Sequence, residues 1–229
     1  MSIQQELEQY ADPVKREFLP RFFKTGKGGY GEGDQFLGVV VPYTRLVAKR
    51  HKTEPFEVVA ALLQSPWHEC RLCALLMLVE RFKKSSEDER RQIVDLYLSQ
   101  TARINNWDLV DLSAPGIIGE YLTDKPRDLL YRLSASDLLW EQRIAVVSTY
   151  TLIKRGELFD TIALAERLLH HKHDLMHKAV GWMLREVGKR DKGLLEQFLE
   201  KYNKRMPRTM LRYAIEKFPD EERKRWMAR

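Results

Sequence analysis

The chain has 229 residues, enough for one large domain or two small ones with a buried core. Its hydrophobic share of 44% is ordinary for a globular protein, and the absence of any run of about 18 apolar residues excludes a membrane-spanning helix. The polar N-terminus lacks the pattern of a secretory signal, and two cysteines are too few for a disulfide framework. We therefore expect a cytoplasmic protein.

The positive charge is concentrated at the C-terminus. The net charge is +6, and residues 201–229 carry ten Lys or Arg against four Asp or Glu, so the first 200 residues are balanced. A local cationic surplus suits a nucleic-acid backbone, because each neutralised phosphate releases a counterion. It is equally compatible with a solvated basic tail that only aids solubility.

The first conspicuous element is a glycine-rich loop, KTGKGGYGEGD, over residues 24–34. It has neither the residue order of a phosphate-binding P-loop nor the strand–turn–helix context of a dinucleotide fingerprint. Its backbone amides could contact a DNA phosphate, or the segment is only a flexible connector. Residues 36–41 are the one candidate for extended structure, which we expect to stop at Pro42.

Apolar residues recur at helical spacing along most of the chain, and alternating strand-like runs are almost absent. Ser65 and Pro66 predict an N-cap and a first-turn proline for a helix through Phe82. Residues 85–89, with three acids near the positive end of a helix dipole, predict the start of the next helix. Together with the apolar runs at 58–63, 93–98 and 162–169, these patterns predict an all-α fold.

Two groups of potential metal or redox ligands have plainer interpretations. Cys70 and Cys73 have redox spacing, but no strand precedes them and no second cysteine pair exists, so we interpret them as core residues. The four histidines of residues 170–177 show no HExxH pattern and no third acidic ligand, and we interpret them as basic surface. No metal is expected at either place.

A longer period is superimposed on the helical one. WHECRLCA from Trp67 and WEQRIAV from Trp140 share an aromatic, a Glu two residues before an Arg, and an apolar run. Anchor residues recur at intervals of 35 or 36, and a shortened copy follows at the C-terminus: Arg71, Trp107, Arg143, Lys178 and finally Arg208. Periods of this size indicate paired helices stacked as a solenoid. We predict a single helical-repeat domain over residues 1–229, and a solenoid of this sort needs no partner, so we expect a monomer.

Equivalent positions in successive repeats line one wall of a superhelix. Arg71, Arg143, Lys178 and Arg208 are therefore expected to form a row on a concave basic face, matching a strand of phosphates. The alternative is that each cation pairs with a neighbouring acid, as Glu69 or Glu141 allows.

Residues 105–111, NNWDLVD, combine an aromatic and an acid. Trp107 and Asp111 are four residues apart and share a helix face, whereas Asp108 lies on another face near a helix start. The repeat register places Trp107 and Asp111 on the cationic wall, where a carboxylate would repel DNA unless it had a function. The alternative is a core tryptophan and a surface charge.

Five segments together resemble the AlkD-like DNA alkylation-repair family, in the right order and over nearly the whole chain: KTGKGGYGEGD, INNWDLVDLS, WEQRIAVVSTY, GWMLREVGKRD and MPRTMLRYAIEKF. The resemblance implies a HEAT-like solenoid that is a monofunctional DNA glycosylase. Its substrates would be cationic N3- and N7-alkylated purines in duplex DNA, and it would need no metal or cofactor.

The resemblance also implies roles for individual residues. Asp111 and Trp107 match the family's catalytic acid and aromatic, Trp182 its second aromatic, and Arg143 its groove-lining arginine. Residues in segments that resemble the family's backbone-gripping surface are Arg185, Arg208 and Arg212.

These residue types suit the implied chemistry. An N3- or N7-alkylated purine is already a cationic leaving group, so positive charge develops on the deoxyribose as the glycosidic bond breaks. A carboxylate can stabilise that charge and orient water, and two indoles offer π faces to it. The family is described as leaving the base in the stack.

Two rival functions remain, a DNA-binding protein without excision and a HEAT-type protein scaffold. RNA also stays open as a ligand.

Overall fold

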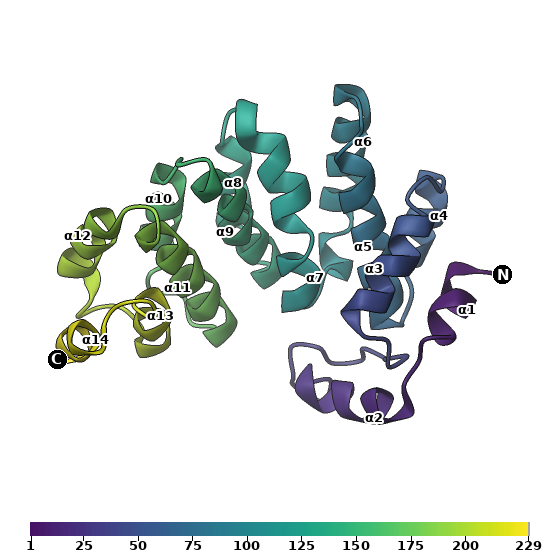
Figure 1. Cartoon of the computed structure of the whole chain (residues 1–229), viewed down its shortest axis with the longest axis horizontal. Coiled ribbons are helices and arrows are strands. Elements are labelled where there is room, and N and C mark those ends of the chain that lie inside the picture. Colours follow the sequence, from purple (N-terminus) through teal and green to yellow (C-terminus); the bar gives the residue numbers. More distant parts are fainter. Residues whose placement is uncertain (229) are drawn as a thin grey trace. The chain divides into compact units, whose positions relative to one another are not determined.

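The computed structural model describes residues 1–228 and is drawn in Figure 1. The only β feature among these residues is an isolated bridge between Gln35 and Trp67, and everything regular is helical. The prediction of an all-α fold built from helical repeats is confirmed. None of the helices described is long and apolar enough to cross a bilayer. The chain divides into two compact units, one ending at Ile117 and one starting at Ile118, which are described separately.

The first unit is organised around one buried helix. Its helices are α1 (Ile3–Glu8), α2 (Pro13–Phe22), α3 (Val41–Arg50), α4 (Phe56–Leu63), α5 (His68–Phe82), α6 (Glu87–Ser99), the 3-10 turn η1 (Thr101–Arg103) and α7 (Trp107–Asp111). Helix α5 is buried from His68 through Val79, because α3, α4, α6 and α7 all pack against it. The residues at the start of α5 therefore lie inside the unit.

Helix boundaries in this unit follow the sequence in part. Helix α6 begins at Glu87, within the predicted segment 85–89, and Ser86 caps it by accepting from the Glu89 amide. Helix α5 begins two residues later than expected, because the Ser65 hydroxyl accepts from the Trp67 amide and Gln35 bridges to Trp67. Residues 36–40 have no regular secondary structure, and Gly38 has a φ of +91°. Pro42 lies in the first turn of α3, which begins at Val41.

The second unit consists of helix pairs. The π-helical turn η2 (Pro115–Gly119) contains the boundary at Ile117 and Ile118. After it come η3 (Leu122–Asp124), α8 (Asp128–Ser134), α9 (Leu139–Lys154), α10 (Phe159–Arg167), α11 (Asp174–Gly188), α12 (Lys192–Tyr202), α13 (Arg208–Ala214) and α14 (Asp220–Met227). Helix α11 packs against α9, α10, α12 and α13 (Figure 1). Gly181 allows a close approach to α13, because a Cβ there would stand 2.5 Å from the Met210 carbonyl oxygen.

The 35- to 36-residue period corresponds to one pair of helices. The five anchor residues of the sequence repeat fall on every second helix: Arg71 on α5, Trp107 on α7, Arg143 on α9, Lys178 on α11 and Arg208 on α13. Within each unit these second helices contact one another, α5 with α7 and α11 with both α9 and α13.

Candidate functional site

The predicted pair Trp107 and Asp111 borders a cavity of about 480 Å³ in the first unit. The cavity lies among α2, the segment 36–42, and helices α5 and α7. Apart from His68 and three acids, its lining is apolar, with Leu19, Val40 and Leu112 among the residues that form it. Both Trp107 and Asp111 are partly exposed, so neither of the interpretations as core tryptophan or as simple surface charge describes them.

Trp107 is held by two phenylalanines, Phe22 at the end of α2 and Phe23 directly after it. Its ring stacks on Phe23 with centroids 5.4 Å apart and receives the edge of Phe22 at 6.0 Å. Phe23 in turn stacks on Phe36 at 5.1 Å. Aromatic pairs of this kind add to the stability from burial alone, and they fix the plane of the indole.

The three acids at the cavity differ in exposure. Glu69 is buried and accepts hydrogen bonds from the backbone amides of Leu37, Gly38 and Val39 at 2.8–3.1 Å, which fixes the course of this segment. Asp108 is buried and bonded to His68. Asp111, one helical turn beyond Trp107, is the partly exposed member of the three. It is therefore the carboxylate most accessible to a substrate.

A buried polar cluster lies beside the aromatic rings. His68 Nε2 is 2.8 Å from Asp108 Oδ2, and Nδ1 is 3.3 Å from Asp34 Oδ2. Arg71 Nη2 pairs with Asp34 Oδ1 at 2.7 Å, and the Asn105 amide donates to the same oxygen at 3.1 Å. The side chains of His68, Arg71 and both aspartates are at most 8% exposed.

The cluster changes the titration of its members. Burial opposes a charge on His68, but the negative charge of Asp108 and the bonds to both aspartates outweigh it and raise its pKa to about 9. Burial alone would raise the pKa of Asp34, yet His68 and Arg71 hold it below its ordinary value. The imidazole is therefore protonated at neutral pH.

The glycine-rich loop delivers Asp34 to this cluster. It is a series of tight turns in which Gly28 and Gly33 have φ near +80°. Gly31 lies so close to α2 and α7 that a Cβ would stand 2.5 Å from the Phe23 carbonyl oxygen and 3.2 Å from Asn106 Nδ2. The loop is thus an ordered support for the start of α7, a role beyond that of a flexible connector.

The assignment of Arg71 to a DNA-contacting row requires correction. Its side chain is 1% exposed, and besides Asp34 it donates to the carbonyl oxygens of Ser65 and Pro66. A phosphate cannot reach this guanidinium in the structure described. The partner acid is Asp34 from the loop, not the neighbouring Glu69.

The residues expected from the second unit lie on α9 and α11. Arg143 is 4% exposed, and Nη1 donates to the Leu175 carbonyl at 2.5 Å, which joins α9 to the start of α11. Trp182 is partly exposed, with its ring 5.8 Å from that of Tyr150. Lys178, one turn before Trp182, pairs with Asp174 at 2.7 Å and stays 39% exposed.

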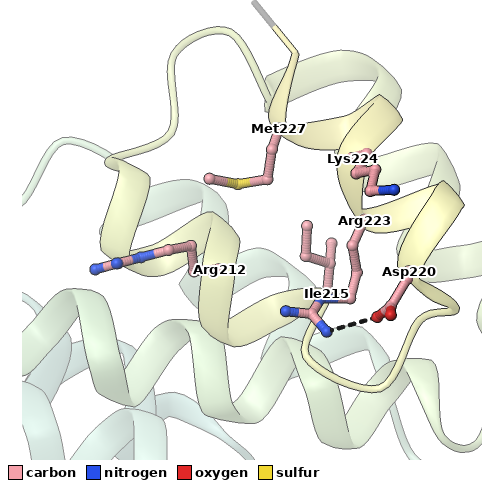
Figure 2. A pocket seen from close by; sticks show the side chains of 6 residues that line it. All are labelled: Arg212, Ile215, Asp220, Arg223, Lys224 and Met227. Atoms are coloured by element: carbon pink, nitrogen blue, oxygen red, sulfur yellow. Dashed lines mark hydrogen bonds and ion pairs between the residues drawn. The ribbon is translucent and has the colours of Figure 1, made fainter.

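The three arginines near the C-terminus differ in their surroundings. Arg185 bonds to Glu216 and Glu186 and is 18% exposed. Arg208 is exposed and donates to the Met227 carbonyl at 2.8 Å. Arg212 is exposed beside a cavity of about 490 Å³ that Ile215 and Met227 also line. Figure 2 shows Arg212 directed away from the ion pair of Arg223 with Asp220.

The cysteines and histidines mostly serve structure. Cys70 and Cys73 are fully buried in α5 as predicted, and burial raises the pKa of Cys70 to about 11. The basic-surface interpretation of residues 170–177 is wrong for two of the histidines. His173 caps α11 through the Leu175 amide, and burial lowers the pKa of His171.

Sequence reasoning missed Asp34, His68 and the phenylalanines around Trp107. Asp34 was in view as the last residue of the glycine-rich loop, and His68 directly precedes Glu69 in the repeat. The available signal was the presence of polar and charged residues, His68 and Arg71 among them, at the start of an otherwise apolar helix. Only the fold shows that these two side chains meet Asp34.

Comparisons with known proteins agree on one family. The family model for DNA alkylation repair enzymes matches residues 3–218. A solved structure from Enterococcus faecalis, described as a predicted DNA alkylation repair enzyme, superposes with a TM-score of 0.70 over 92% of this chain and 97% of that chain, at 15% identity. Among curated proteins no sequence matches.

Proposed function

Because the chain belongs to the family of DNA alkylation repair enzymes, we propose that it is a DNA glycosylase that excises cationic N3- and N7-alkylated purines from duplex DNA. The observation that carries the proposal is the placement of Trp107 and Asp111 together on one largely apolar cavity, both partly exposed. The other two acids at the cavity, Glu69 and Asp108, are buried.

The proposed role of Asp111 is electrostatic. As the bond from the purine to C1′ of the deoxyribose breaks, the purine leaves as a neutral base and the sugar acquires positive charge. A carboxylate in an apolar setting stabilises that charge more than it would in water, and it can orient the water that adds to C1′. No general acid is needed, since the alkylated ring already carries its positive charge.

The proposed role of Trp107 is to present a π face to the cationic sugar. Trp107 suits the role because Phe22 and Phe23 fix its ring. For Trp182, which belongs to the second unit, the role as second aromatic that the resemblance implies is kept as a separate proposal. For Arg143 we propose a supporting role, the connection between α9 and the start of α11, because its side chain is buried.

DNA would be held through its phosphates. We propose Lys178, Arg208 and Arg212, which are at least partly exposed, together with Arg185 as the cations that contact the backbone. The sequence contains no polar motif of the kind that reads a base edge in a pocket. We therefore propose that the damaged base stays in the stack during excision.

The test is release of free base from duplex DNA containing N7-methylguanine. We expect release by the wild type and a loss of about 100-fold or more with Asp111→Asn, by analogy with removal of one preorganised group. Asp95→Asn, an exposed acid on α6, is the matched control and should keep wild-type activity. Salt-sensitive DNA binding with no release by the wild type would instead identify a binding protein.

A further inference from the structure

We propose that His68, as an imidazolium bonded at both ring nitrogens, is the positioning residue that holds α7, and with it Trp107 and Asp111, in the geometry required for excision. The inference rests on the proposed function, and it concerns a residue that touches neither DNA nor the reacting atoms.

Helix α7 needs support from outside itself, because it has only five residues. A helix this short is not stable by its own hydrogen bonds. Two side-chain contacts tie its first turn and the residues before it to the rest of the unit: Asp108 to His68, and Asn105 to Asp34. Both lead to the same buried cluster.

The geometry of the ring requires the charged form. Each nitrogen of His68 faces a carboxylate oxygen, Nε2 toward Asp108 and Nδ1 toward Asp34. A neutral imidazole has one N–H and can donate to only one of them, whereas the imidazolium donates to both. The faces of the ring pack on Phe23 and Phe36 at 4.9 and 4.7 Å, a contact that favours a cation.

The charges around the ring balance only when it is protonated. Asp34 and Asp108 are negative, and Arg71 and protonated His68 are positive, so the buried cluster is neutral. Deprotonation would leave one unpaired negative charge in an apolar environment, which is costly. The remaining charged groups nearby are Glu69 on α5, Arg103 behind Arg71, and Asp111 on α7.

The ring also reaches Trp107 through Phe23. Phe23 contacts both rings: it stacks on Trp107 with centroids 5.4 Å apart, and it packs on His68 at 4.9 Å in a tilted arrangement. Asp108 lies directly after Trp107, and Asp111 follows one turn later. Loss of the His68–Asp108 bond and of the ring contacts around Phe23 would therefore displace Trp107 and Asp111 together.

The experiment measures single-turnover excision of N7-methylguanine from pH 6 to pH 10, corrected for loss from the same DNA without protein. The wild-type rate should fall as pH rises through about 9, where His68 loses its proton. His68→Gln should lower the rate at pH 7 at least tenfold and remove that fall. Asp34→Asn leaves the ring one carboxylate, so the fall should move to lower pH.

A matched control exists in the same unit. His51 also bridges two carboxylates, Glu54 at 3.0 Å and Glu6 at 2.7 Å, but it does not contact α7. His51→Gln should therefore retain the wild-type rate and its pH profile. All variants should bind undamaged duplex with wild-type affinity, because none of these side chains belongs to the proposed phosphate contacts.

The outcomes separate the inference from the proposed function. A His68→Gln protein with the wild-type rate and profile overturns the positioning role, and if that variant does not fold, an unchanged profile in Asp34→Asn does so. If the wild type releases no base, the proposed function fails and NMR decides the inference. A ring that titrates near pH 9, with amide protection of residues 107–111 lost in parallel, supports it; a ring that titrates near pH 6.5 contradicts it.

Discussion

Burial decides which charged residues of the first unit are available to a ligand. Arg71 and Asp111 both stand in strong sequence motifs, yet the guanidinium is 1% exposed and the carboxylate is partly exposed. The motif around Trp107 was sufficient to predict the shared face of Trp107 and Asp111. The motif around Arg71 could not predict that its side chain is buried. The partner, Asp34, comes from a loop whose course no local sequence pattern specifies.

The buried imidazolium should make stability depend on pH. The pKa of His68 is raised in the folded state, from 6.5 to about 9, so its stabilising contribution is complete below about pH 6.5 and is lost as pH rises through about 9. We expect the wild type to lose up to about 3 kcal/mol of unfolding free energy across that window. Urea titrations at pH 6 and pH 10 measure it. His68→Gln should show a smaller loss; an equal loss would place its origin elsewhere.

The two cysteines should be unreactive in the folded protein. Both thiols are fully buried, and burial raises the pKa of Cys70 to about 11, so almost no thiolate is present at pH 8. A thiol-specific colour reagent should modify neither residue until denaturant is added. Rapid modification of the native protein would contradict the packing of α5.

At the scale of elements, the sequence period predicts which helices are equivalent but not how long each one is. The anchors fall on every second helix, as expected from intervals of 35 or 36 residues. Helix α7 nevertheless has five residues where α9 has sixteen. The late start of α5 likewise depends on a bridge from Gln35, a contact between distant segments that periodicity does not report.

The close contact between α11 and α13 should be sensitive to one added methyl group. In Gly181→Ala the new Cβ would stand 2.5 Å from the Met210 carbonyl oxygen and 2.6 Å from Tyr213 Cβ. The two helices must separate, and we expect a loss of about 1–3 kcal/mol in unfolding free energy. Thermal unfolding measures this directly.

Gly26→Ala is the matched control for that substitution. A Cβ at Gly26 meets nothing within 4 Å, and its φ is not in the left-handed region. Its unfolding temperature should be equal to or slightly above that of the wild type. Equal effects of the two substitutions would mean that the α11–α13 contact adapts without cost.

At the scale of the molecule, charge and composition predict a class of ligand but not a contact set. The C-terminal surplus of cations is a property of the sequence, and in the structure Arg208 and Arg212 are exposed whereas Arg185 is bonded to two glutamates. Ion pairing of this kind depends on side chains that meet only after folding. The prediction of a single domain and that of a monomer stay predictions.

Affinity for undamaged duplex should depend steeply on salt if these cations grip phosphates. The logarithm of the binding constant should fall linearly with the logarithm of salt concentration, and Arg212→Gln should reduce the slope by about one. Fluorescence anisotropy at several salt concentrations gives the slope. Lys84→Gln, at an exposed lysine of the first unit, should leave it unchanged. Weak binding that does not change with salt concentration would favour the rival function, a protein-interaction scaffold.

The brevity of α7 has a consequence for protein engineering. The tryptophan–acid pair occupies one and a half turns whose orientation is set by a loop, two phenylalanines and a buried histidine. Grafting those five residues alone onto another helical-repeat scaffold would transfer the tryptophan and the acid without the residues that orient them. A successful transfer would have to carry residues 22–36 and the start of α5 as well, as one inseparable cassette.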